Sequence, residues 1–349
     1  MSSDRPDWGS VMPPDEGFLA RTTAEPAIAP DIPIVDTHVH LWRLFADSPY
    51  FVPELATDIA ESGHTVISTV YVECNAFYRA LGPAHLKAVG ETEHAVGQAA
   101  IAASGIYTSA RIAEAIVGFA DLRLGDRVAE TLEAHVEAAN GRFRGIRQRA
   151  KWDADPVVRG RWTEDRPELY LDAAFNAGLK RLTAKGLSFD ASVFHPQIPE
   201  VTALARAHPD ASIVLNHTGS PLGHGAYAGK PDENHANWLN AMRTLASCPN
   251  VSVKLGGLLM NLANYDFSTA AKPPTSAELA TLWRPYIEPC IELFGAERCM
   301  VSSNFPVDRV GFGYRTVWNM FKRLTAGCSS DEKRLLFSET ARRVYRLEG

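Results

Sequence analysis

Two histidines stand two residues apart, His38 and His40, in the apolar stretch IVDTHVH. Side chains at positions i and i+2 of a strand point to the same face, so both imidazoles, with Asp36 behind them, are expected to enter one site. Neutral imidazole binds Zn, Mn, Fe or Ni well, so such a pair predicts a divalent metal site. The alternative is a hydrogen-bonded pair that only shapes a polar pocket.

Polar or charged residues also close other short apolar stretches: Glu73, Arg147, Asp190, His217, Lys254 and Asn304. Charged groups inside a sheet are costly unless they are paired or used. We therefore interpret these residues as one convergent site. Separate structural roles are the alternative, in which Asp190 braces a turn and Lys254 pairs with Glu73 or Asp190.

The β-branched stretches that carry these residues predict strands at 32–40, 64–73, 115–122, 143–149, 187–194, 211–219, 250–257 and 299–306. Segments of helical period separate them. This alternation predicts an α/β fold, a (β/α)8 TIM barrel whose strands are buried on both faces. The rival is an open doubly wound sheet, which should show a glycine-rich phosphate turn after its first strand, where this chain has His-x-His.

Residues 276–295 show a clear helical pattern. Thr275 and Glu278 predict a capping box at its start, and Pro285 and Pro289 are expected to kink the helix or split it. The last helical stretch, residues 329–347, is expected to cover the outer wall of the barrel.

We divide the chain into an N-terminal extended arm, residues 1–30, and a single barrel domain, residues 31–349. Long loops rich in Gly, Asn and Pro follow Arg149, Thr218 and Gly257, and loops after strands lie at the carboxyl-terminal face of a barrel. They are expected to form a lid, with ordinary surface loops as the alternative. The arm and the large barrel are compatible with a homodimer.

Composition excludes several classes of protein. The chain has 349 residues, a net charge of −6 and 46% hydrophobic residues, which excludes a disordered or low-complexity protein. The acidic balance gives no reason to expect nucleic acid or a membrane as a partner, and the apolar runs are too short to span a bilayer. The five cysteines lack Cys-x-x-Cys spacing, which fits a reducing, cytoplasmic setting.

Six motifs follow one another in the order IVDTHVHLW, RGIR, FDASVFHPQ, LNHTGSP, VKLGG and SSNFPVD. From about residue 33 onward the chain thus resembles the amidohydrolase-related (amidohydrolase 2) family of TIM-barrel hydrolases, in the branch that contains 2-pyrone-4,6-dicarboxylate lactonase and sugar-acid lactonases. The resemblance implies hydrolysis of a carbonyl ester, often a lactone, in a cytoplasmic catabolic setting. Some members use a divalent metal such as Zn or Mn, and others use none.

Carried over by position, the resemblance implies that His38, His40 and His217 line the active site and ligate the ion in metal-dependent members. It assigns Arg147 to a substrate carboxylate, which a guanidinium binds through two parallel hydrogen bonds. The remaining candidates for substrate binding are Asp190, His195, Lys254 and Arg79. For Arg79 the alternative is an ordinary surface arginine.

One position departs from the family pattern. Members usually carry aspartate at the end of the eighth strand, as general base or metal ligand, and this chain has Asn304. An amide cannot act as a base. Glu73 is the first substitute, because it ends a strand and shares the parity of Thr69 and Tyr71, and Asp308 is the second.

The expected function is hydrolysis of a small carboxylated ester, foremost a lactone, by water that a metal or a carboxylate activates. A second interpretation is a metal-dependent non-oxidative decarboxylase or hydratase of the same superfamily. A third, from another class, is a catalytically degenerate barrel that binds a small acid.

Overall fold

The computed structural model describes residues 12–45, 47–159, 166–257 and 270–348, and within them eight parallel strands form one sheet. In spatial order these are β1 (Ile34–Val39), β4 (Val66–Val72), β5 (Arg111–Gly118), β6 (Phe143–Arg149), β7 (Ser188–Ser192), β8 (Ile213–Leu215), β9 (Val251–Lys254) and β10 (Cys299–Met300). A parallel bridge between Val39 and Phe305 joins the first strand to the chain beyond the last. The expected (β/α)8 barrel is confirmed.

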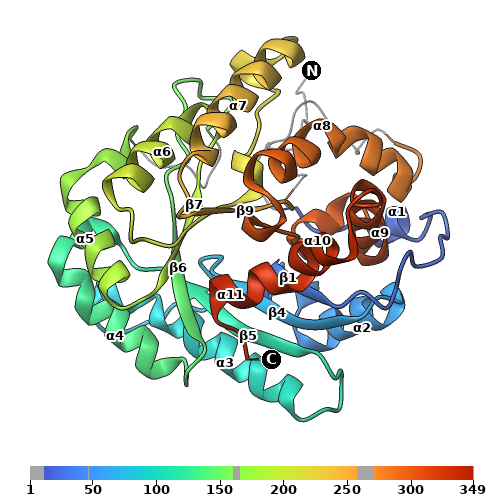
Figure 1. Cartoon of the computed structure of the whole chain (residues 1–349). Coiled ribbons are helices and arrows are strands. Elements are labelled where there is room, and N and C mark those ends of the chain that lie inside the picture. Colours follow the sequence, from blue (N-terminus) through green and yellow to red (C-terminus); the bar gives the residue numbers. More distant parts are fainter. Residues whose placement is uncertain (1–11, 46, 160–165, 258–269, 349) are drawn as a thin grey trace, which may run out of the picture.

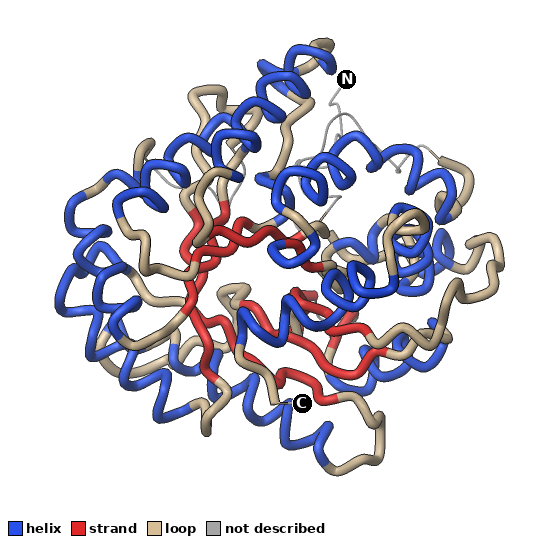
Figure 2. Tube along the Cα trace, in the orientation of Figure 1, coloured by secondary structure: helices blue, strands red, loops and turns tan. Residues whose placement is uncertain are grey.

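Helices surround this ring of strands (Figures 1 and 2). They are α2 (Val52–Ser62), α3 (Val89–Ala103), α4 (Val128–Ala138), α5 (Ala173–Ala184), α6 (Ile198–Ala207), α7 (Pro231–Ala246), α8 (Ser276–Phe294) and α9 (Tyr314–Leu324). A two-stranded antiparallel ribbon, β2 (Trp42–Phe45) with β3 (Ser48–Tyr50), follows β1. The described helices include none that is long and apolar enough to cross a membrane.

Helix α8 begins with the predicted capping box of Thr275 and Glu278 but is not split by its prolines. Pro289 has no N–H, so the carbonyl oxygen of Pro285 loses its usual partner within the helix. The ring of His235 on α7 replaces that partner, with Nε2 2.9 Å from the Pro285 oxygen. The neighbouring helix therefore satisfies the carbonyl that a proline leaves free.

The C-terminal run consists of α10 (Ser330–Arg334), a π-helical turn (Leu335–Glu339) and α11 (Thr340–Tyr345). Tyr345 and Ala341 belong to a buried apolar cluster with the residues that fill the barrel interior, Val35, Val70, Val72, Ala115, Val117, Val214 and Met300. Beyond α11, Arg346 donates to the Arg144 carbonyl, near the start of β6. The expectation that this helix covers the outer wall is wrong: it closes the amino-terminal end of the barrel (Figure 1), because the small interior side chains leave room for Tyr345.

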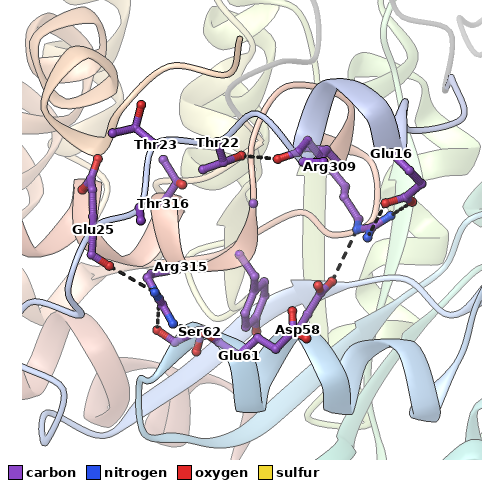
Figure 3. Close-up of a pocket in the computed structure, with 15 residues that line it drawn as sticks. Glu16, Thr22, Thr23, Glu25, Asp58, Glu61, Ser62, Arg309, Arg315 and Thr316 are labelled. Atoms are coloured by element: carbon purple, nitrogen blue, oxygen red, sulfur yellow. Dashed lines mark hydrogen bonds and ion pairs between the residues drawn. The ribbon is translucent and has the colours of Figure 1, made fainter.

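The described part of the arm, with the short helix α1 (Glu16–Leu19), packs on the barrel domain of its own chain. Ile28 N donates to Asn319 Oδ1 of α9 at 2.8 Å. Between the arm, α2 and α9 lies a cavity of about 580 Å³, where Arg309 forms ion pairs with Glu16 and Asp58 (Figure 3). None of the predicted catalytic residues lines this cavity.

Candidate active site

The three predicted imidazoles meet at the carboxyl-terminal end of the barrel. His38 and His40 come from the end of β1, and His217 follows β8. The ring centroid of His38 lies 4.5 Å from that of His217 and 5.0 Å from that of His40. All three side chains are buried. Distant stretches of chain therefore converge as the sequence predicts.

Hydrogen bonds to carbonyl groups fix the tautomers of two of these rings. His217 Nδ1 lies 3.1 Å from the Gly256 oxygen, and His40 Nδ1 lies 2.7 Å from the Val72 oxygen. A carbonyl oxygen only accepts, so each Nδ1 carries the hydrogen and each Nε2 presents a lone pair. In the described structure the buried His217 Nε2 has no hydrogen-bond partner. His217 therefore offers a free acceptor to the site.

His38 has the opposite tautomer. Its Nε2 lies 3.1 Å from Arg147 Nη1, and a guanidinium only donates, so Nε2 is the acceptor and Nδ1 carries the hydrogen. Within the described ranges the buried Nδ1 has no hydrogen-bond partner. His38 thus offers an N–H beside the lone pair of His217.

Burial keeps all three imidazoles neutral. It lowers the pKa of His40 to about 3, with the charge of Arg147 adding to the effect. Burial is also the first cause that lowers the pKa of His38 and of His217, followed for His217 by the charge of Lys151. Near neutral pH the rings act as a hydrogen-bond donor and as bases, not as cations.

Arg147 is engaged by the protein itself. Its Nε donates to Glu73 Oε1 at 2.7 Å, its Nη2 donates to the Glu73 carbonyl, and its Nη1 donates to His38. These bonds use three of the five N–H groups of the guanidinium and leave one on Nη1 and one on Nη2, so the substrate contact that the resemblance assigns to this arginine stays a prediction. In this arrangement Arg147 orients Glu73 and His38.

Glu73 is a carboxylate held by two cations. Burial raises its pKa, but Arg149, 3.5 Å from Oε2, and Arg147 outweigh burial and leave the pKa below its ordinary value. The same two arginines hold the carboxylate in place, Arg147 through a hydrogen bond to Oε1 and Arg149 from the side of Oε2. Glu73 therefore serves the site as the counter-ion of these arginines.

Tyr71 does not face the barrel interior, so the expectation that Glu73 faces inward because it shares the parity of Tyr71 is wrong in its reason. Tyr71 points outward, where its hydroxyl donates to Glu91 Oε1 of α3 at 2.9 Å, and the alternate residues Val70 and Val72 fill the interior. Glu73 lies beyond the end of β4, so strand alternation no longer determines its direction. Its ion pair with Arg147 still places it in the site.

Asp190 and Lys254 form an ion pair deeper in the barrel, with 2.8 Å between Lys254 Nζ and Asp190 Oδ2. Asn216 donates to the same oxygen at 3.0 Å, and the Tyr345 hydroxyl lies 3.1 Å from both carboxylate oxygens. Neither side chain of the ion pair has any exposed surface. Lys254 therefore pairs with Asp190, as one alternative interpretation expected, and substrate contacts of either residue stay a prediction.

Asn304 faces the site with an acceptor. Its Nδ2 donates to Asp308 Oδ1 at 2.8 Å, and its backbone N donates to the His38 carbonyl at 3.0 Å. The buried Oδ1 of Asn304 has no hydrogen-bond partner in the described part of the chain. Asp308, the second candidate base, thus fixes the orientation of the Asn304 amide.

Asp36 connects β1 to the chain that follows β10. It accepts from Ser303 N at 2.9 Å, from Ser303 Oγ at 2.5 Å and from the Tyr314 hydroxyl at 2.8 Å. Burial raises the pKa of Asp36 to about 6, against the effect of these bonds. Asp36 therefore fixes the position of His38 on β1 relative to Asn304, which follows Ser303.

Two predicted substrate contacts lie apart from this cluster. Arg79 is 38% exposed and pairs with Glu93 on α3, which matches the surface alternative. His195, after β7, is buried and accepts at Nδ1 from Leu222 N at 3.1 Å. No hydrogen bond between described residues links either side chain to the three imidazoles.

Lys151 is a site residue that the sequence analysis missed. It is 5% exposed, its Nζ lies 5.1 Å from the centroid of the Phe194 ring, and burial lowers its pKa to about 7. The signal in the sequence is the alternation of Arg147, Arg149 and Lys151, whose side chains follow the period of a strand.

The predicted metal set does not fit this arrangement. Among the described residues no group of three or more His, Cys, Asp or Glu side chains is placed to hold a metal ion. The reason lies at His38, whose Nε2 accepts a hydrogen bond from the cationic Arg147. We therefore assign no metal ligands among His38, His40 and His217.

The long loops are described only in part, because residues 160–165 and 258–269 lie outside the described residues. In the described portion the loop after β8 bonds to the loop after β6. Tyr227 donates its hydroxyl hydrogen to Asp153 Oδ2 at 2.7 Å, and Ala226 N donates to Asp155 Oδ2 at 2.7 Å. These bonds join the two loops beside His195.

Comparisons with known proteins agree with this architecture. Residues 35–347 match a family model described as amidohydrolase. The uncharacterized protein y4mH of Sinorhizobium fredii is 33% identical over 329 residues, 91% of this chain and 99% of that protein. An L-fucono-1,5-lactonase of Burkholderia multivorans is 29% identical over 90% of this chain and 96% of its own. A zinc-bound amidohydrolase structure from Burkholderia multivorans has a TM-score of 0.69 at 25% identity, covering 90% of this chain and 99% of its own.

Proposed function

This chain belongs to the amidohydrolase family of hydrolases, and we propose that it hydrolyses the ester bond of a small lactone. The similarity to L-fucono-1,5-lactonases over nine-tenths of the chain supports this reaction class. The observation that carries the proposal is the pair of neighbouring neutral imidazoles, His38 with a free N–H and His217 with a free lone pair.

In the proposed reaction the carbonyl oxygen of the lactone accepts a hydrogen bond from His38 Nδ1. His217 Nε2 takes one proton from a water molecule as the water oxygen attacks the carbonyl carbon, and Asn304 Oδ1 accepts a hydrogen bond from the hydrogen that the water keeps. The ring C–O bond then breaks, and the imidazolium of His217 returns the proton to the leaving alkoxide. The product is a hydroxy acid, and the step requires no oxidant, reductant or metal.

The charges around the site favour an anionic substrate. Glu73 pairs with Arg147 and Arg149, and Asp190 pairs with Lys254, whereas Lys151 has no carboxylate partner among the described residues. A cation in a low-dielectric site that lacks a protein partner stabilises a substrate carboxylate. We therefore propose a lactone that carries a carboxylate.

Hydrolysis of a panel of lactones, followed by acid release at constant pH, tests the proposal. The variant His217→Gln is expected to lower kcat at least about 100-fold, because it removes the base. His85→Gln, on a partly exposed ring paired with Glu130, is the matched control. Carbon dioxide release would instead identify a decarboxylase. Binding of small acids without turnover of any substrate would identify a degenerate barrel.

A further inference from the structure

Lys151 is a buried amine that has no counter-ion among the described residues. Its side chain is 5% exposed, and it makes no hydrogen bond or ion pair with any described residue. Its recorded interaction is with the face of Phe194, 5.1 Å from the ring centroid. A ring face compensates an ammonium group only in part for the water that it loses on burial. Lys151 therefore retains an unmet requirement for an anion.

The neighbouring carboxylates are directed elsewhere. Asp153, two residues along the chain, accepts from the Tyr227 hydroxyl at 2.7 Å and from Asp155 N at 2.8 Å. Asp155 in turn accepts from Ala226 N and Val157 N. These bonds hold both carboxylates in the loop structure.

Arg147 and Arg149, which alternate with Lys151 along the chain, are paired with protein groups. Arg147 donates to Glu73 and His38, and Arg149 forms an ion pair with Glu73. Lys151 lies close to the reacting groups as well, since its charge contributes more than any other charged group to lowering the pKa of His217. Within the described ranges, Arg147 and Arg149 pair with a protein carboxylate and Lys151 does not.

We propose that Lys151 binds the carboxylate of the substrate and thereby selects lactones that carry a negative charge over neutral sugar lactones. This inference rests on the proposed function, because it names the substrate class of the same site. The role differs from the one expected for Arg147, which holds Glu73 and His38 in place.

Calorimetric binding of glutarate tests the assignment, because a carboxylated lactone yields a product with two carboxylates. The wild-type protein is expected to bind glutarate and to bind the neutral diamide of glutarate at least tenfold more weakly. Lys151→Met is expected to weaken glutarate binding at least tenfold. Lys151→Arg, which keeps the charge, is expected to remain within about threefold of the wild type. Lys185→Met, at a surface lysine paired with Glu133, is expected to change nothing.

The melting temperature distinguishes a binding role from a structural one. A buried cation without a partner destabilises the fold, so Lys151→Met is expected to melt at the same temperature as the wild type or higher. A fall in melting temperature, or failure of this variant to fold, would overturn the inference. The inference would also be overturned if the wild type and Lys151→Met bound glutarate equally. It would be overturned as well if the wild-type protein bound no glutarate.

These outcomes are separate from those of the proposed function. His217→Gln is expected to bind glutarate like the wild type, although it does not turn over a lactone. Glutarate binding that depends on Lys151, in a protein that hydrolyses no lactone, would disprove the proposed reaction and leave the anion site standing. Lactone hydrolysis that is unchanged in Lys151→Met would disprove the anion site and leave the proposed reaction standing.

Discussion

The rings of His38 and His217 lie 4.5 Å apart, and the bonds on their far sides give them opposite hydrogen-bonding character. Arg147 occupies Nε2 of His38, whereas the Gly256 carbonyl occupies Nδ1 of His217. A substrate that reaches both rings meets an N–H on His38 and a lone pair on His217 without any change of protonation state. The geometry therefore depends on contacts outside the pair, and these can be altered singly.

Gly257→Ala is expected to displace His217. Gly257 has φ of +73°, and an added Cβ would lie 1.8 Å from His217 Nδ1. A ring shift of this size is expected to lower kcat about 100-fold. Gly141→Ala is the matched control, because Gly141 has φ of +77° with nothing within 4 Å of the added carbon. An equal loss of activity in both variants would show that backbone strain, not displacement of His217, is responsible.

Asn304→Asp is expected to lower stability, although aspartate is the usual family residue. In the wild type, Asn304 Nδ2 donates a hydrogen bond to Asp308 Oδ1 at 2.8 Å. The substitution replaces this donor with a second buried carboxylate. The expected cost is about 1–3 kcal/mol in the free energy of unfolding. The double variant Asn304→Asp with Asp308→Asn restores one donor and one acceptor, and most of the stability is expected to return. Urea unfolding of the three proteins measures both effects, and no recovery in the double variant would contradict this account.

Catalysis is expected to survive chelation of divalent ions. The lone pair of His38 Nε2 already accepts from Arg147, and the proposed base is an imidazole. Activity before and after dialysis against EDTA, with the metal content measured by mass spectrometry, checks this expectation. Loss of activity on chelation, with recovery on addition of Zn or Mn, would show that the imidazoles rearrange around an ion.

Acid is expected to destabilise the fold through His135. Burial lowers the pKa of this ring to about 4, and Nε2 and Nδ1 lie 2.8 Å from the Phe119 oxygen and from Thr92 Oγ1. As the pH falls from about 6.5 to about 4, the unfolded chain takes up a proton that the folded chain refuses, so stability is lost in this window. The loss amounts to at most about 3 kcal/mol for this ring.

The slope of stability against pH isolates this contribution. His135→Gln is expected to flatten the dependence of the unfolding free energy on pH between pH 6.5 and 4, whatever its stability at pH 7. His85→Gln serves as the control, since that ring is partly exposed. An unchanged slope in His135→Gln would assign the acid sensitivity to other buried groups.

The strand pattern predicted the barrel because most of the predicted strands combine a β-branched stretch with a polar end, as in the 64–73 segment that contains β4. It also predicted convergence of His38, Arg147 and His217, since parallel strands of a closed sheet bring their carboxyl ends to one mouth. Pairing partners were harder to predict. Whether Arg147 faces a substrate or Glu73 depends on side-chain geometry across neighbouring strands.

Other misses have physical causes of the same kind. Tyr71 points outward because Glu91 of α3 accepts its hydroxyl, a contact between segments that periodicity does not register. Lys151 lies beyond the end of β6 and outside the RGIR motif, so its spacing from Arg147 and Arg149 is the signal that marks it. Arg79 stands in a polar stretch near Glu73, but its partner is Glu93 on the exposed face of α3.

The position of Tyr345 has a consequence for a chain that ends before α11. Its hydroxyl braces Asp190 of β7, yet it belongs to α11, which follows all eight strands along the chain. A chain without α11 would hold every histidine of the site and still lack the hydroxyl that contacts Asp190 and the ring that packs on the interior valines.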